Sequence, residues 1–122
     1  MCIRDSPIAP MSDETKEEYL RPFLNPGEDR RPTLTFPRHI PLDEEPGDTF
    51  IEINKNAEFH KNSNIPKLFI NADPGFLLVG SQRDEVRKWN NLKEVTVKGN
   101  HFIQEDSPNE ITVDINDFKN DL

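Results

Sequence analysis

The sequence has 122 residues, of which 33% are hydrophobic and 31% are charged, and its formal net charge is −8. A self-sufficient globular domain usually has roughly 45–50% apolar residues, so we expect a thin core here, or one that further sequence completes. An acidic chain gains nothing from approaching phosphate backbones, which argues against nucleic acid as a partner. No apolar run approaches the roughly 20 residues of a membrane helix, so we expect no membrane partner either.

The N-terminus carries little structural information. The single cysteine, Cys2, excludes an intrachain disulfide and a cysteine-based zinc site. No apolar segment typical of a secretion signal is present, so we expect a cytoplasmic protein, or a periplasmic one if an export signal precedes this sequence. Residues 1–6 resemble the translated adapter sequence found at the ends of metagenomic reading frames; the alternative is an ordinary disordered tail. We therefore treat residues 1–11 as a non-native or disordered segment.

Two helices are expected in the first half of the chain. Ser12 is a suitable N-cap for a helix over 13–21, and Pro22 would end that helix because proline disfavours helical geometry in the residue before it. A second helix is expected over 49–61, with Asp48 or Thr49 at its start.

The segment between these helices is rich in proline. Residues 22–47 contain six prolines, which exclude a long helix or a central strand. A disordered linker is one interpretation. The other, which we favour, is an ordered segment that packs against other structure, because a solvated linker has no need of apolar residues. The apolar residues that recur among the prolines are Leu34, Phe36, Ile40 and Leu42.

Strands and helices alternate from residue 67 onward. The apolar run 67–71 and the β-branched run 94–98 predict strands, and 81–89 predicts a helix between them. Residues 107–110 (SPNE) form a capping box with proline at the first helical position. Apolar residues then follow on one face of a last helix: Ile111, Ile115, Phe118 and Leu122. The order predicts a right-handed βαβ unit with two parallel strands, which needs further strands or another chain to cover it.

Residues with possible chemistry follow the two strands. His101 comes just after the second strand, where ligands bind in parallel sheets, and an imidazole is the side chain best suited to exchange protons near neutral pH as a general base. A surface histidine is the alternative, as we read His39 and His60. Asp73 is either a triad acid or the start of the Asp-Pro-Gly turn. The three histidines lack metal-ligand spacing, and no Gly-x-Ser-x-Gly or similar nucleophile elbow is present.

Three blocks of sequence resemble the haloalkane dehalogenases, in particular the subfamily of the hexachlorocyclohexane-degrading enzymes. The blocks are 30–41 (RRPTLTFPRHIP), 65–75 (IPKLFINADPG) and 101–111 (HFIQEDSPNEI). They occur in the order and spacing of that family, and the resemblance covers about residues 12–122. It implies the C-terminal portion of an α/β-hydrolase fold, with the last two parallel core strands, their flanking helices and an incomplete sheet. Residues 12–61 would be the end of the helical cap and the return to the core, and 62–122 the C-terminal part of the core.

The resemblance also implies a reaction. In the family, an aspartate attacks the halogen-bearing carbon, a tryptophan and a second donor hold the leaving halide, and a histidine activates the water that hydrolyses the alkyl-enzyme ester. His101 matches that histidine. The nucleophile, the halide-binding tryptophan and the subfamily's triad acid have no counterpart here, so the chain alone is expected to be inactive. Trp89 is interpreted as a packing residue. The resemblance also argues against Asp73 as the triad acid, because this subfamily takes its acid from an earlier strand.

Pocket residues and partners follow from the same resemblance. The residues that match substrate-pocket positions are Phe36, Pro37, Ile40, Phe76, Leu77 and Phe102. The expected partners are a small halogenated hydrocarbon, water and halide, with no cofactor and no metal, and the parent protein is expected to be a monomer. Two alternatives stay open. Coelenterazine-type luciferases resemble the same three blocks, and a non-catalytic binding module would explain the missing nucleophile.

Overall fold

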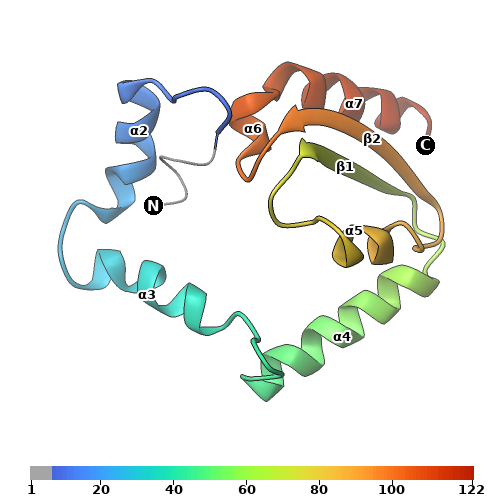
Figure 1. Cartoon of the computed structure of the whole chain (residues 1–122), viewed down its shortest axis with the longest axis horizontal. Coiled ribbons are helices and arrows are strands. Elements are labelled where there is room, and N and C mark those ends of the chain that lie inside the picture. The colour runs from blue at the N-terminus through green and yellow to red at the C-terminus, as the bar shows by residue number, and fades with distance from the viewer. Residues whose placement is uncertain (1–6) are drawn as a thin grey trace. The chain divides into compact units, whose positions relative to one another are not determined.

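A computed structural model describes residues 7–122, and it divides them into two compact units. One unit comprises residues 13–59, and the other comprises residues 60–122 together with the segment before residue 13. Figure 1 labels the elements of both units, which are described separately below. Within the described residues, no helix is long and apolar enough to cross a membrane.

The 13–59 unit is entirely helical apart from its turns. It holds α2 (Asp13–Leu20), η1 (Arg21–Phe23), η2 (Glu28–Arg30), α3 (Arg31–Arg38) and most of α4 (Gly47–Asn62). The predicted helices 13–21 and 49–61 are confirmed as α2 and α4 to within two residues at each end. None of residues 13–59 is buried, so this unit contributes no core of its own.

The proline-rich segment is ordered and includes a helix that the sequence did not predict. Pro32 falls in the first turn of α3, where a missing N–H costs nothing, and Pro37 falls in its last turn. The helix is therefore only eight residues long, which agrees with the exclusion of a long helix. Arg30 ties the segment back on itself by donating from Nε to the Phe23 carbonyl at 2.9 Å and from Nη2 to the Leu24 carbonyl at 3.1 Å.

The second unit contains the predicted parallel strand pair. Strand β1 (Lys67–Pro74) pairs with β2 (Leu92–Gly99) in a register that runs from Lys67 opposite Leu92 to Pro74 opposite Gly99. Both strands extend beyond the predicted runs. Helix α5 (Ser81–Val86) lies between them in the chain, and α6 (Ile103–Asp106) and α7 (Pro108–Asn120) follow β2, with α7 packed along the strands in Figure 1.

The capping prediction for α7 and the predicted end of α5 are wrong in detail. Helix α7 starts at Pro108 as expected, but the Ser107 side chain makes no capping hydrogen bond. Its Oγ donates instead to the Lys98 carbonyl of β2 at 2.7 Å, and Ser107 is buried. Helix α5 likewise has no side-chain cap, and it ends at Val86 rather than at residue 89. Ser107 is therefore used to attach α7 to the sheet, not to close the end of the helix.

An ion pair joins the end of α5 to β2. The Arg87 guanidinium donates to the two Glu94 carboxylate oxygens at 2.8 and 2.7 Å. These hydrogen bonds hold the pKa of Glu94 below its ordinary value. The pair is largely exposed, so it orients the α5 connection more than it stabilises the fold.

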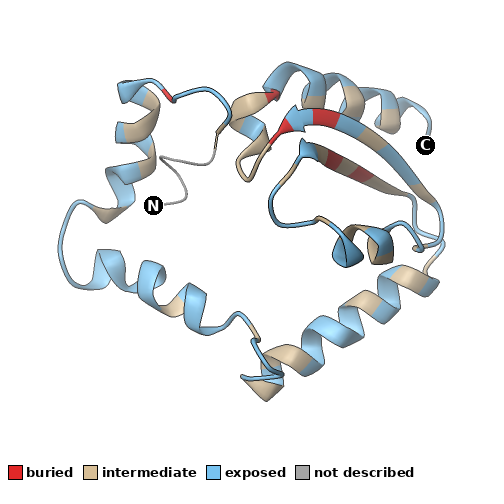
Figure 2. Cartoon of the chain, in the orientation of Figure 1, coloured by how far each residue is buried: buried red, intermediate tan, exposed pale blue. Residues whose placement is uncertain are grey.

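The core of this unit is small and lies on the strands. Phe69 and Val97 are the buried hydrophobic residues of the sheet, and Met11, from the segment before α2, is the other buried hydrophobic residue in the described part of the chain. Figure 2 shows buried positions on β1, on β2 and at the α6–α7 junction. The apolar face of α7 is only partly covered, since Ile115 is 47% exposed, and Leu122, just beyond the end of the helix, is 74% exposed.

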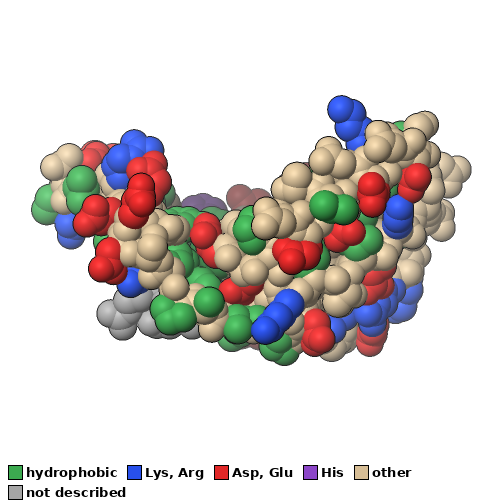
Figure 3. Space-filling model, turned by 90° about the horizontal axis from the view of Figure 1, so that it is seen from above, with side chains coloured by type: hydrophobic (Ala, Val, Ile, Leu, Met, Phe, Trp, Pro, Cys, Tyr) green, Lys and Arg blue, Asp and Glu red, His purple; other side chains and the backbone are tan. Residues whose placement is uncertain are grey.

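Many large hydrophobic side chains of the described residues therefore reach solvent. Figure 3 shows such side chains at the surface, among acidic and basic ones. A parallel sheet is stable when both of its faces are covered, and this sheet has two strands. The sheet is thus incomplete, as the sequence predicted.

The N-terminal segment before α2 is described only in part. The backbone N–H of Ile8 donates to Asp106 Oδ1 at 2.7 Å, and Met11 is buried. Residues 1–6, on which the adapter interpretation rests, lie outside the described residues. The assignment of residues 1–11 as a non-native or disordered segment stays a prediction.

The small core leads to a prediction about the isolated chain. We expect the 122-residue chain to lose structure gradually in urea, with weak near-ultraviolet circular dichroism and binding of a hydrophobic dye. The reason is that the three buried hydrophobic side chains of residues 7–122 cannot support a cooperative core. Urea titration followed by circular dichroism and dye fluorescence checks this. A sharp two-state transition of a monomer would contradict it and would favour a stand-alone binding module.

Candidate active site

The carboxyl ends of the two strands meet at one edge of the sheet. The register places Pro74 opposite Gly99, so the loops after β1 and β2 leave the sheet side by side. The Gly75 N–H donates to the Gly99 carbonyl at 3.0 Å and joins the two loops. Gly75 has a φ of +76°, and a Cβ there would lie 2.8 Å from the Ala72 carbonyl oxygen, so glycine is required at this junction. Residues on the two loops are therefore held close together.

His101 lies in the loop after β2 and is half-buried. Its imidazole stacks on the Phe76 ring, with centroids 5.6 Å apart and planes 24° apart. The Phe102 ring contacts it from a tilted position at 4.9 Å. The His101 Nδ1 atom is buried and has no hydrogen-bond partner among the described residues. A buried imidazole nitrogen without a partner is costly, so this site suits a polar group supplied by structure beyond the described residues.

A pocket of about 190 Å³ opens beside His101. Two of the predicted pocket residues, Phe76 and Leu77, line it together with the imidazole. Its other lining residues are Phe69, Ile70, Ala72, Gly75, Leu78, Asn100 and Ile103. Most of these side chains are apolar, and the imidazole is one of the few polar groups in the wall. Phe102 does not line this pocket but contacts the His101 ring.

The other predicted pocket residues belong to the 13–59 unit. Phe36 and Pro37 lie on α3, and Ile40 follows it; Phe36 is 73% and Ile40 47% exposed. Exposed apolar side chains on a short helix fit a surface that further structure covers. Their contribution to a substrate pocket stays a prediction.

The remaining candidates are not among the residues that line the pocket beside His101. Asp73 is exposed, it belongs to β1, and it makes no hydrogen bond to His101. His39 and His60 are exposed, as predicted, and His60 stacks on Trp89 with centroids 5.2 Å apart, which agrees with a packing role for that tryptophan. Within residues 7–122, no group of three histidine, cysteine, aspartate or glutamate side chains is placed to hold a metal ion.

Sequence reasoning missed the side chain that shapes the loop after β1. Arg83, on α5, donates from Nη2 to the Ala72 carbonyl at 3.0 Å and from Nε to the Leu78 carbonyl at 3.0 Å. These bonds fix both ends of the loop that carries Phe76 and Leu77. No sequence signal marks this role, because it depends on how the loop folds back on α5.

Two further residues hold the loop that carries His101. The Asp106 carboxylate accepts the Asn100 N–H at 3.0 Å through Oδ2. Gly99 is buried against α6, and a Cβ there would lie 2.9 Å from Ile103 Cγ2. Gly99 is the last residue of β2 and stands two residues before the candidate base, a position that can be seen in the sequence.

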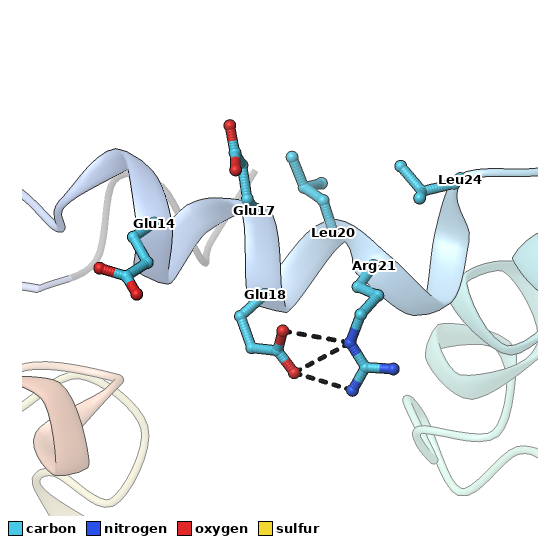
Figure 4. Close-up of a pocket in the computed structure, with 6 residues that line it drawn as sticks. All are labelled: Glu14, Glu17, Glu18, Leu20, Arg21 and Leu24. Carbon is cyan, nitrogen blue, oxygen red and sulfur yellow. Dashed lines mark hydrogen bonds and ion pairs between the residues drawn. The ribbon is translucent and has the colours of Figure 1, made fainter.

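A larger pocket of about 530 Å³ lies on α2 and η1 and carries none of the predicted site residues. Figure 4 shows its lining side chains, among which Glu18 accepts hydrogen bonds from Arg21. The hydrogen bonds and the charge of Arg21 hold the pKa of Glu18 below its ordinary value. In Figure 4 the other labelled side chains point away from this ion pair, so they do not converge on a common ligand.

The fold and the site define the class of protein. Two parallel strands with flanking helices, an incomplete sheet, and a histidine just after the last strand are features of an α/β-hydrolase core near its C-terminal end. A solved haloalkane dehalogenase from Agrobacterium tumefaciens superposes with a TM-score of 0.84 at 28% identity, covering 95% of this chain and 40% of that one. A solved ancestral haloalkane dehalogenase gives a TM-score of 0.83 at 32% identity, covering 96% and 42%.

Curated relatives point to the same enzymes. A haloalkane dehalogenase of Mycolicibacterium smegmatis is 49% identical over 114 residues, which are 92% of this chain and 36% of the relative. One of Sphingobium indicum is 50% identical over 85% of this chain and 35% of its own length. A coelenterazine h 2-monooxygenase of Renilla reniformis is 42% identical over 82% of this chain and 32% of the relative. No protein-family profile matches the chain.

The resemblance seen in the three sequence blocks is therefore confirmed. The chain is similar to haloalkane dehalogenases over most of its length and corresponds to their C-terminal region. It spans about a third of the length of the curated relatives it matches.

The packing of Gly99 can be tested in a chimera. The chimera joins residues 12–122 to the preceding part of the Sphingobium indicum relative. We expect Gly99→Ala to destabilise it by about 1–3 kcal/mol, because the new methyl group must displace Ile103 and with it α6. Urea unfolding of the folded chimera measures this.

Gly47→Ala is the matched control. A Cβ at Gly47 would meet nothing within 4 Å, and the residue has no positive φ, so that variant is expected to match the unsubstituted chimera. Equal stabilities for the Gly99 and Gly47 variants would contradict the close approach of α6 to β2.

Proposed function

We propose that this chain is the C-terminal part of a haloalkane dehalogenase, in which His101 is the water-activating base of a hydrolase acting on carbon–halogen bonds. The substrate is a small halogenated hydrocarbon, and the products are an alcohol and halide. We further propose a monomeric, cytoplasmic parent protein, with residues 12–61 as the end of the cap domain and 62–122 as the C-terminal part of the core.

The observation that carries this proposal is the environment of His101. Its ring follows β2 at the carboxyl edge of the sheet, stacks on Phe76, and lines an apolar pocket. Its buried Nδ1 has no partner among the described residues, which suits a carboxylate supplied by the rest of the parent. A carboxylate at Nδ1 would fix the tautomer and leave Nε2 to take a proton from water.

The reaction would proceed in two steps. An aspartate of the parent attacks the carbon in line with the carbon–halogen bond, which breaks with its electron pair on the departing halide. His101 then takes a proton from water as the water oxygen attacks the ester carbonyl. The bond from the carbonyl carbon to the alkoxy oxygen breaks, the alkoxide takes the proton held by His101 and leaves as the alcohol, and the aspartic acid so formed loses its proton to solvent. The apolar walls formed by Phe76 and Leu77 suit a halocarbon, and once covered by the rest of the parent they would keep bulk water from the reacting atoms.

Halide release tests the proposal. We expect the chimera to release bromide from 1,2-dibromoethane, because the Sphingobium part supplies a nucleophile and this chain supplies the base. Bromide is measured by ion chromatography. A well-folded chimera that releases no bromide would reject the proposed function.

His101→Gln separates the two chemical steps. The alkylation step needs no base, whereas ester hydrolysis does, so the variant is expected to release about one equivalent of bromide per site and then turn over about 10²–10⁴-fold more slowly. Rapid-quench measurement of bromide gives both phases. His60→Gln, at an exposed histidine, is the control and should keep normal turnover. Unchanged turnover in the His101 variant would show that another group is the base.

The Renilla reniformis relative motivates a second candidate. Its 42% identity leaves open that the same segment serves a coelenterazine-oxidising protein. A second chimera, with the preceding part of the Renilla protein, provides the comparison. Light emission from that chimera with coelenterazine, together with no bromide release from the Sphingobium chimera, would favour an oxygenase.

A further inference from the structure

We propose that Asp106 is a positioning residue for His101: its carboxylate holds the backbone of the loop that carries the imidazole. This inference rests on the proposed function of His101 as a base. Asp106 does not touch the pocket and would act only through the place it gives the histidine.

The hydrogen bond that carries this proposal is adjacent to His101 in the chain. Asp106 is the last residue of α6, and its Oδ2 accepts the N–H of Asn100 at 3.0 Å. The peptide bond after Asn100 leads directly to His101. The second oxygen, Oδ1, accepts the N–H of Ile8 at 2.7 Å, a bond that the chimera lacks because it begins at residue 12.

Two further contacts hold α6 against the end of β2. The Ser107 Oγ donates to the Lys98 carbonyl at 2.7 Å, and Ile103 packs against Gly99. With α6 fixed in this way, the Asp106 carboxylate presents a rigid acceptor to the loop. The His101 loop is short, with Asn100 bound at its start and α6 beginning at Ile103.

The consequence for catalysis concerns the second chemical step more than the first. Alkylation depends on the nucleophile and the halide site, which lie elsewhere in the parent, whereas ester hydrolysis depends on the reach of the His101 ring to water. A displacement of about 1 Å in a catalytic group can cost about 10²-fold in rate. Loss of the Asp106 contact should therefore slow hydrolysis while the first halide release stays nearly unchanged.

The test compares Asp106→Ala with Asp117→Ala in the chimera. Asp117 is exposed on α7, so its removal makes the same change in charge away from the loop. For Asp106→Ala we expect steady turnover to fall about 10–100-fold while the first-turnover bromide burst changes less than about threefold. Asp117→Ala should leave both phases unchanged. For Asp106→Asn, which keeps one acceptor oxygen, we expect a turnover between those of the two alanine variants. This variant replaces Asp106→Ala in the test if the alanine variant does not fold.

A structural role alone predicts a different result. A purely structural role would lower the bromide burst and the steady turnover together, because fewer molecules would fold. That outcome would overturn the proposal. An unchanged turnover in Asp106→Ala would also overturn it. Imidazole resonances of His101 provide a readout that needs no activity: they should shift or broaden in the Asp106 variants and not in Asp117→Ala. If the unsubstituted chimera releases no bromide, the proposed function fails, and unshifted His101 resonances would separately refute the positioning role.

Discussion

The parallel register of β1 and β2 is the constraint on which the rest of the site depends. Pro74 and Gly99 are opposite each other, so the two loops that follow emerge at the same edge, and the Gly75 N–H to Gly99 carbonyl bond joins them at their bases. The stacking of Phe76 on His101 is possible only because of this arrangement. A shift of one residue in the register would separate the two loops and move every strand side chain to the opposite face.

The unit that contains β1 and β2 is incomplete both in its packing and in its hydrogen bonding. The sheet has two strands, little of its apolar surface is buried, and the His101 Nδ1 is enclosed without a partner in the described part of the chain. Asn71, in the middle of β1, bonds Thr96 across the strands at 3.1 Å, while its buried Oδ1 has no partner among residues 7–122. The hydrogen bonding of both atoms is therefore incomplete within the described residues.

Periodicity in the sequence predicted most of the elements but not the contacts between them. The strands, α2, α4 and α7 follow from apolar spacing and helix-start residues. Helix α3 was missed because its two prolines argued against a helix; Pro32 lies in the first turn, where proline is tolerated, and Pro37 lies inside the helix, one residue before its end. His101 could be selected because it follows a strand directly. Arg83 and Asp106 could not, because their partners are backbone groups whose positions depend on the path of the loops. The sequence predicted Ser107 as the cap of α7 from the local pattern alone. Its actual bond, to the Lys98 carbonyl, joins separate elements and has no local signal.

The anchoring of the loop after β1 by Arg83 has an implication for how such a pocket can change. The guanidinium bonds to the carbonyls of Ala72 and Leu78, so the backbone path between them does not depend on which side chains the loop displays. Leu77 lines the pocket without a ring contact to His101, while Phe76 also stacks on the imidazole. Residue 77 is thus the position at which evolution or a protein engineer can reshape the cavity for bulkier or smaller molecules, with the least disturbance to the neighbouring histidine.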